Sequence, residues 1–119
     1  MSLTDKIKST ILSGAVPANQ RKLGVEIEGL YYTSGFNRLP VNKTTQYSAS
    51  DLFKEITQSA EKNYPFSYSL EPGGQLEWAS EPAKSLWNIK KQFEYHKKLE
   101  DNICKKKFID RLYLSLEPF

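Results

Sequence analysis

Hydrophobic and polar residues alternate in two stretches of this chain, and both stretches predict β-strands. In residues 22–32, the apolar face holds Leu23, Val25 and Ile27, and the opposite face holds Glu26 and Glu28. In residues 66–80, alternation continues on both sides of a Pro-Gly-Gly sequence. The second stretch therefore predicts a β-hairpin with one apolar and one polar face.

The alternation also fixes the register of this hairpin. A two-residue turn would pair apolar with polar residues, whereas a three-residue loop at Pro72–Gly74 keeps both faces consistent. That loop places Glu71 opposite Gln75 and Ser69 opposite Glu77. Pro72 suits the first turn position, and Gly74 tolerates the positive φ that such a loop requires.

Three other stretches have the 3.6-residue periodicity of amphipathic helices. We expect them to cover about residues 4–13, 50–62 and 82–107, with Thr4 and Ser50 as N-caps of the first two. Residues 33–47 predict a long loop, and residues 112–116 predict a buried strand. The resulting fold class is α+β, an antiparallel sheet with flanking helices, and residues 1–119 are expected to form a single domain.

Composition indicates the class of protein and the cellular compartment to expect. The chain has 119 residues, 39% of them hydrophobic and 26% charged, which is typical of a globular protein. It has no apolar run of the ~20 residues that a membrane span requires, and no signal-peptide core. Cys104 is a single cysteine and has no partner for an internal disulfide, so we expect a cytoplasmic protein with no membrane association.

A local excess of lysines in the last third of the chain leaves a net charge of +3. We interpret these lysines as a solvated helix face with cations near its C-terminal end, where the helix dipole favours them. No nucleic-acid recognition motif accompanies them, so nucleic acid is not an expected partner.

The polar faces of the two predicted strand regions carry most of the candidate chemistry. One face holds Glu26 and Glu28, two residues apart, and the hairpin face holds Glu71 and Glu77. Carboxylates gathered on one face repel one another unless a cation lies between them. Hard divalent cations prefer oxygen ligands, so these faces predict a metal site at Glu26, Glu28, Glu71 and Glu77. The alternatives are a solvent-exposed sheet face and a glycosidase-like acid–base pair.

Other candidates are better explained as structural residues. His96 lies on the apolar face of the long helix, which favours a core or boundary position, and Cys104 has no adjacent base. Trp78 and Trp87 are expected in the core. Phosphate-binding glycine motifs and zinc-binding spacings are absent from the sequence.

Two motifs resemble the N-terminal part of glutamate–cysteine ligases of the plant and proteobacterial type, and related carboxylate–amine ligases. They are Arg21-Lys22-Leu23-Gly24-Val25-Glu26-Ile27-Glu28 and Ser69-Leu70-Glu71-Pro72-Gly73-Gly74-Gln75-Leu76-Glu77. The order of a long helix, a strand and a proline at position 118 is also similar. The resemblance spans about residues 20–118, and the two motifs are its specific part.

The resemblance implies a glutamine synthetase-like catalytic fold and a ligase of glutathione biosynthesis. In that family, ATP phosphorylates the γ-carboxylate of L-glutamate, and an amine, usually that of L-cysteine, attacks the acyl phosphate. The family's metal-binding positions, for Mg²⁺ or Mn²⁺, correspond to Glu26, Glu28, Glu71 and Glu77. Gln75 lies between these positions and is the expected cofactor-binding residue, in contact with substrate or a metal-bound water. The matched motifs assign no catalytic residue.

The chain also departs from the family pattern. Trp78 replaces a smaller aliphatic residue, and residues 79–82 differ from the expected run of small residues, which leaves the amine substrate open. The family's enzymes contain several hundred residues, so we expect an N-terminal fragment that is inactive by itself. The alternative is a non-catalytic, ligase-like binding module that needs a partner chain or self-associates through an open sheet edge.

Overall fold

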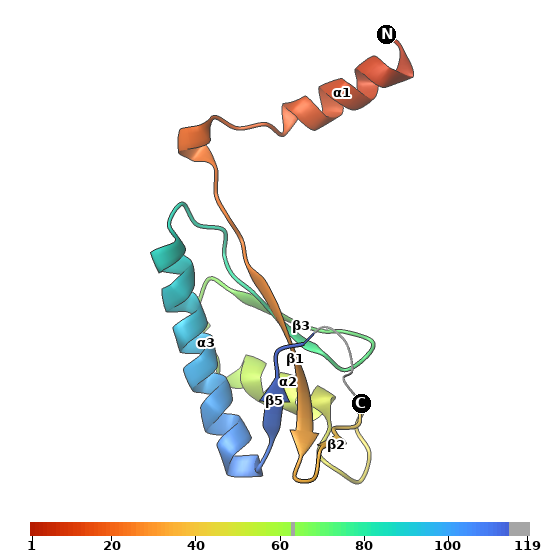
Figure 1. Cartoon of the computed structure of the whole chain (residues 1–119), viewed down its shortest axis with the longest axis vertical. Helices are drawn as coiled ribbons and strands as arrows, with labels where there is room; N and C mark the ends of the chain where they lie inside the picture. Colours follow the sequence, from red (N-terminus) through yellow and green to blue (C-terminus); the bar gives the residue numbers. More distant parts are fainter. Residues whose placement is uncertain (63, 115–119) are drawn as a thin grey trace.

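Strand β1 (Glu26–Thr33) lies at the centre of an antiparallel sheet. A computed structural model describes residues 1–62 and 64–114 of the chain (Figure 1). The first half of β1 pairs with β4 (Leu76–Ala79), and β4 pairs with β3 (Ser67–Leu70). The second half of β1 pairs with β2 (Asn37–Arg38) and β5 (Asp110–Leu112). The predicted α+β class with an antiparallel sheet is thus confirmed.

The β3–β4 hairpin has the predicted register and loop. Ser69 lies opposite Glu77, and the backbone N–H of Glu71 donates to the carbonyl of Gln75 at 2.8 Å. The N–H of Gly74 donates to the carbonyl of Glu71 at 2.8 Å and closes the turn. Gly74 has a φ of +83°, which non-glycine residues rarely adopt. The three-residue loop Pro72–Gly74 is therefore confirmed.

Helices α2 (Ala49–Ser59) and α3 (Leu86–Lys107) cover the same face of the sheet. Side chains of both helices meet side chains of β1 and β4 in one apolar cluster. Its buried members are Tyr31, Leu39, Leu52, Ile56, Leu76, Ile103, Cys104 and Ile109. Since cross-strand partners share a face, Ile27, Trp78 and Tyr68 also face the helices. The opposite face carries Glu28, Glu77 and Ser69.

Two helices begin earlier than the periodicity predicts. Helix α1 (Leu3–Ser13) is capped by Ser2, and α2 is capped by Ser48 rather than Ser50. Each cap forms a capping box with an aspartate three residues later, Asp5 or Asp51, which satisfies backbone donors at both positions. The caps expected at Thr4 and Ser50 are therefore wrong by two residues.

The start of α3 also differs from the prediction. Ser85 caps this helix, so it begins at Leu86 rather than Pro82. Trp87 in its first turn is 70% exposed, which makes its expected core position wrong, whereas Trp78 is fully buried as expected. The exposed Trp87 stacks instead with the Lys90 ammonium, 5.3 Å from the ring centre.

Strand β5 and helix α1 lie near the two ends of the described chain. Strand β5 begins two residues earlier than the predicted strand 112–116, and residues 115–116 of that strand lie outside the described residues. At the other end, α1 is connected to the sheet by an extended segment with a single 3₁₀ turn, η1 (Ala18–Gln20). No helix in residues 1–62 and 64–114 has the length and apolar character needed to cross a membrane.

Candidate functional site: an acidic sheet face beside a buried carboxylate network

Strand pairing brings two of the predicted metal ligands together. Glu28 of β1 lies directly opposite Glu77 of β4 on the face away from the helices. The N–H of Ser80 donates to the carbonyl of Val25 at 2.9 Å, which sets the hydrogen-bonding alternation along this pair of strands. Glu28 and Glu77 therefore occupy a non-hydrogen-bonded position, where side chains approach most closely. Like charges at such a position destabilise a sheet unless a cation or donor separates them.

A serine connects a third carboxylate to this pair. Ser69 lies opposite Glu77, and its hydroxyl contacts one carboxylate oxygen of Glu77 at 3.2 Å and one of Glu71 at 3.3 Å. A hydroxyl has one proton, so it donates to one of these oxygens at a time. Ser69 thus holds Glu71 and Glu77 on the same side of the hairpin.

Glu26 lies two residues before Glu28 on the same face of β1, opposite Ala79. Glu26, Glu28 and Glu77 line a hollow of about 400 Å³, together with Ile27 and Tyr113. The structure therefore brings Glu26, Glu28 and Glu77 around one hollow, with Glu71 held beside Glu77.

Gln75 has a different environment from the four glutamates. Its side chain lies against Gly73. The contact is so close that a Cβ at Gly73 would collide with the Gln75 amide oxygen. Arg38 of β2 donates to the carbonyl of Gly73 and holds the tip of the same loop. The Gly-Gly sequence thus provides both the positive φ of Gly74 and the close approach of Gln75 at Gly73.

The donor chemistry of this acidic face fits a hard divalent cation. Carboxylate oxygens are the ligands that Mg²⁺ prefers, and Mg²⁺ is commonly held by one or two carboxylates together with substrate phosphates and waters. In the part of the chain that the structure describes, no group of three or more His, Cys, Asp or Glu side chains is placed to hold a metal ion. Metal binding at Glu26, Glu28, Glu71 and Glu77 therefore stays a prediction.

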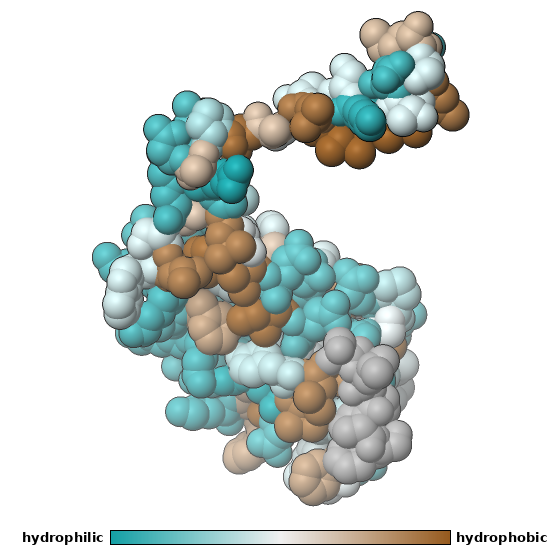
Figure 2. Space-filling model, turned by 45° about the horizontal axis from the view of Figure 1, so that its top comes forward, coloured by the Kyte–Doolittle hydropathy of each residue, from teal (hydrophilic) through white to brown (hydrophobic). Residues whose placement is uncertain are grey.

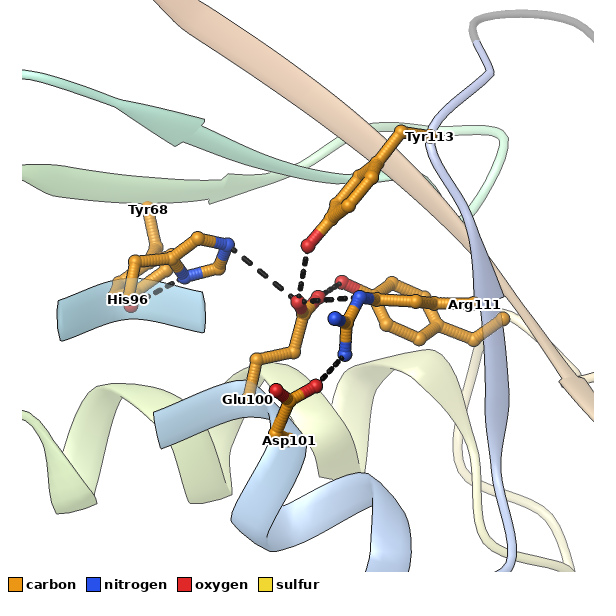
Figure 3. A network of polar contacts seen from close by, with 7 residues as sticks. Tyr68, His96, Glu100, Asp101, Arg111 and Tyr113 are labelled. Carbon is orange, nitrogen blue, oxygen red and sulfur yellow. Dashed lines mark hydrogen bonds and ion pairs between the residues drawn. The ribbon is translucent and has the colours of Figure 1, made fainter. Parts of the chain in front are cut away.

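A second polar cluster, which the sequence did not predict, lies on the helix side of the sheet (Figure 3). Its centre is Glu100 of α3, which is fully buried. The Tyr31 hydroxyl donates to Oε1 of Glu100, and the Tyr113 hydroxyl donates to Oε2 at 2.7 Å. The Arg111 Nε lies 3.0 Å from Oε2, and the Arg111 guanidinium also pairs with Asp101. Glu100 thus connects α3 to β1 and to the end of the sheet near β5.

His96 extends this network by one turn of α3. Its Nε2 lies 3.7 Å from Oε2 of Glu100, and its Nδ1 lies 3.0 Å from the Tyr68 hydroxyl. A proton on Nε2 faces the carboxylate favourably and leaves Nδ1 to accept the tyrosine hydrogen bond. The imidazole also stacks on Trp78, with 5.5 Å between ring centres.

Burial controls the ionisation of this network. Burial, together with the nearby charge of Arg111, lowers the pKa of His96 to about 4, so the imidazole is neutral at pH 7. Burial raises the pKa of Glu100, while hydrogen bonds from Tyr31 and Tyr113 and the charge of Arg111 oppose that rise. Burial also raises the pKa of the Cys104 thiol to about 12, which leaves it protonated and unreactive. The core or boundary position predicted for His96 is confirmed, and Cys104 is buried, in agreement with the structural role expected for it.

Tyr113 belongs to both clusters. Its hydroxyl donates to Glu100, and its side chain lines the hollow beside Glu26, Glu28 and Glu77. The absence of a side chain at Gly29 leaves room for the Tyr31 hydroxyl. A Cβ at Gly29 would lie 3.0 Å from this hydroxyl and crowd its hydrogen bond to Glu100. In the sequence, the signal for this network is the i, i+4 spacing of His96 and Glu100 on an otherwise apolar helix face.

Comparison with known proteins adds no further identification, since no protein-family model, curated protein or solved structure matches the chain.

Proposed function

We propose that this chain is the N-terminal part of an ATP- and Mg²⁺-dependent ligase of the glutamate–cysteine ligase type, with a glutamine synthetase-like catalytic fold. The observation that supports this proposal best is the direct cross-strand pairing of Glu28 and Glu77 on the sheet face away from the helices. The Pro72–Gly74 loop and Glu71 lie at the end of the same face. Glu28 belongs to one of the two motifs on which the sequence resemblance depends, and Glu71, the loop and Glu77 belong to the other.

In this proposal, the acidic face binds the phosphate end of ATP through a divalent cation. The cation neutralises negative charge on the phosphate oxygens during phosphoryl transfer. Glu28 and Glu77 hold it, Glu26 and Glu71 add negative charge around it, and Ser69 orients Glu71 and Glu77. Gln75, directly after the hairpin loop, contacts substrate or a metal-bound water.

The reaction proposed for the complete enzyme has two steps. The γ-carboxylate oxygen of L-glutamate attacks the terminal phosphorus of ATP, which gives an acyl phosphate and releases ADP. The amine nitrogen, in the leading case that of L-cysteine, then attacks the acyl carbon. Phosphate leaves, the nitrogen loses a proton, and the product is γ-glutamylcysteine, the precursor of glutathione.

Metal binding by the isolated chain tests the role of the glutamate pair. We expect the protein to bind Mn²⁺ weakly, and Glu77→Gln to weaken this binding by at least about tenfold, because it removes one of two facing charges. Paramagnetic broadening of NMR signals from β1 and β4 measures the affinity. Glu94→Gln, on the exposed surface of α3, is the matched control and leaves the affinity unchanged. A β1–β4 sheet that stays folded and shows no response to millimolar Mn²⁺ contradicts the metal assignment.

Ligase activity is tested by complementation. We expect the chain to release ADP from ATP in the presence of L-glutamate and L-cysteine once it is combined with the remaining part of a glutamate–cysteine ligase catalytic domain. A Glu77→Gln chain in the same mixture is expected to lose this activity. Failure with every amino-acid amine, in a mixture that forms a stable complex, contradicts the ligase proposal.

A binding module without catalysis is the second candidate. In the described part of the sheet, β3 pairs with β4 alone, which leaves an edge that another strand can join. Self-association through that edge stays a prediction. It differs from the ligase proposal in requiring neither ATP nor a divalent cation.

A further inference from the structure

Helix α1 has a well-defined local structure but no tertiary contacts that bury it. The Ser2–Asp5 capping box begins the helix, and the N–H of Gly14 closes its last turn. None of the residues Leu3–Ser13 is buried. An isolated helix of 11 residues is marginal in water even with a favourable sequence, because nucleation is costly. A helix of this length therefore needs a surface against which to pack.

The sequence of α1 provides a face for such packing. Leu3, Ile7 and Ile11 follow one another at four-residue spacing, which places them on one side of the helix. They are 74%, 51% and 70% exposed. Figure 2 shows the corresponding apolar stripe along the projecting helix. We call these three residues the α1 stripe.

A second exposed apolar surface lies where the N-terminal segment joins the body of the protein. Leu23 forms an isolated bridge with Ala83, and Leu86 and Trp87 follow within the first turn of α3. Leu23, Leu86 and Trp87 are all more than half exposed. Figure 2 shows apolar side chains gathered on this end of the body, beneath the projecting segment. We call these three residues the base patch.

We propose that the α1 stripe of one molecule packs on the base patch of a second copy, and that the exchange is reciprocal. Each molecule then contributes one helix and one patch, which gives the self-complementary contact of a two-fold dimer. This contact is independent of the acidic face, and it does not use the free edge of β3.

The connection between α1 and the body favours a second copy over the chain's own patch. Residues 14–22 contain the η1 turn, with the N–H of Gln20 bonded to the carbonyl of Pro17 at 2.8 Å. The Arg21 side chain also donates to the carbonyl of Val16. This structure directs α1 away from its own body (Figure 1), and the radius of gyration is 18.3 Å, against about 13–14 Å for a compact chain of this length. Folding back would require this segment to reverse, whereas a second copy accepts α1 as it stands.

The area available is sufficient for a dimer. Two reciprocal contacts cover six aliphatic side chains of the two stripes, together with four leucines and two tryptophans of the two patches. Burial of these groups is on the order of the 1,200 Å² at which stable interfaces begin. Trp87, which is 70% exposed in each patch, is the type of residue that dominates interface energetics.

The oligomeric state of the intact chain tests the proposal. Light scattering after size exclusion is expected to show a dimer that dissociates on dilution. Ile7→Asp combined with Ile11→Asp should raise the dissociation constant at least about a hundredfold, because each change removes a buried aliphatic group and adds a charge. Ser9→Asp combined with Ser13→Asp places the same charges on α1 outside the stripe and should leave the dimer intact.

The patch side is tested separately by Trp87→Ala, which should also weaken the dimer while the circular dichroism of the body is retained. Amide hydrogen exchange in α1 should slow as the protein concentration rises. A monomer at every concentration overturns the proposal, and so does a dimer that resists both the Ile7→Asp/Ile11→Asp pair and Trp87→Ala. A monomer in which α1 amides are protected at all concentrations shows that the chain covers its own patch, and also overturns it.

Discussion

Replacement of Glu100 by alanine is expected to lower the free energy of unfolding by about 3–5 kcal/mol, the usual cost of removing one partner from a buried ion pair. Glu100 is fully buried and accepts hydrogen bonds from Tyr31 and Tyr113 while it neutralises Arg111. Its loss leaves the buried Tyr31 hydroxyl and the partly buried Tyr113 hydroxyl without their acceptor. The Arg111 guanidinium then keeps Asp101 as its carboxylate partner in the network. Since a domain of this size is stable by about 5–15 kcal/mol, this is a large share of the total.

Urea denaturation followed by circular dichroism measures this effect, and α3 offers a matched control. Glu94 lies on the same helix, and its exposed side chain pairs with Lys90 at 3.4 Å. Glu94→Ala should change stability by no more than about 0.5 kcal/mol, because exposed i, i+4 pairs contribute little. Equal, small effects of both substitutions would show that the Glu100 network does not stabilise the fold.

The contrast between the hairpin and this network shows what the sequence can predict. The register of β3 and β4 depends on alternation within a few residues of Pro72–Gly74, so a local pattern determines it. Prediction of the Glu28–Glu77 pair required one further inference, namely that β1 pairs with β4. The alternation suggested that inference because both strands have a carboxylate face.

The Glu100 network could not be predicted in the same way. Tyr31 is 69 positions from Glu100 in the sequence, and nothing local indicates that β1 places its hydroxyl against α3. A glutamate on a helix is normally read as solvent-exposed, since an unpaired charge is almost never fully buried. The partners that make its burial possible come from three separate elements, and only the tertiary structure brings them together.

The same reasoning explains the errors at helix ends. The apolar periodicity of α3 extends back to Leu86, but the body covers this helix only from about Ile89 onward. Periodicity identifies the side of a helix that can be buried, whereas the length of the partner surface determines how much of that side is buried. Leu86 and Trp87 consequently belong to the base patch rather than to the core.

The second large effect is a loss of stability in mild acid, for which His96 is responsible. Its pKa in the folded protein is about 4, chiefly because burial disfavours the charged imidazole, against 6.5 in an unfolded chain. Between these values the unfolded chain binds a proton that folded His96 does not, so acid favours unfolding. The contribution of His96 is fully present above pH 6.5, and about 3 kcal/mol of it is lost as the pH falls to about 4.

Comparison with His96→Gln isolates this contribution from other groups that titrate in the same range. Glu100 acts in the opposite direction, because its raised pKa makes the folded state bind a proton more readily than the unfolded state. Asp5 and Asp51 have lowered pKa values through their capping-box bonds to Ser2 and Ser48, so they too lose stabilising interactions in acid, and they do so in both proteins. The free energy of unfolding, measured by urea denaturation at several pH values, should therefore fall less steeply between pH 6.5 and 4 in the variant. Identical slopes in the two proteins would show that His96 takes up its proton in the folded state, and that the network around Glu100 accommodates a charged imidazole.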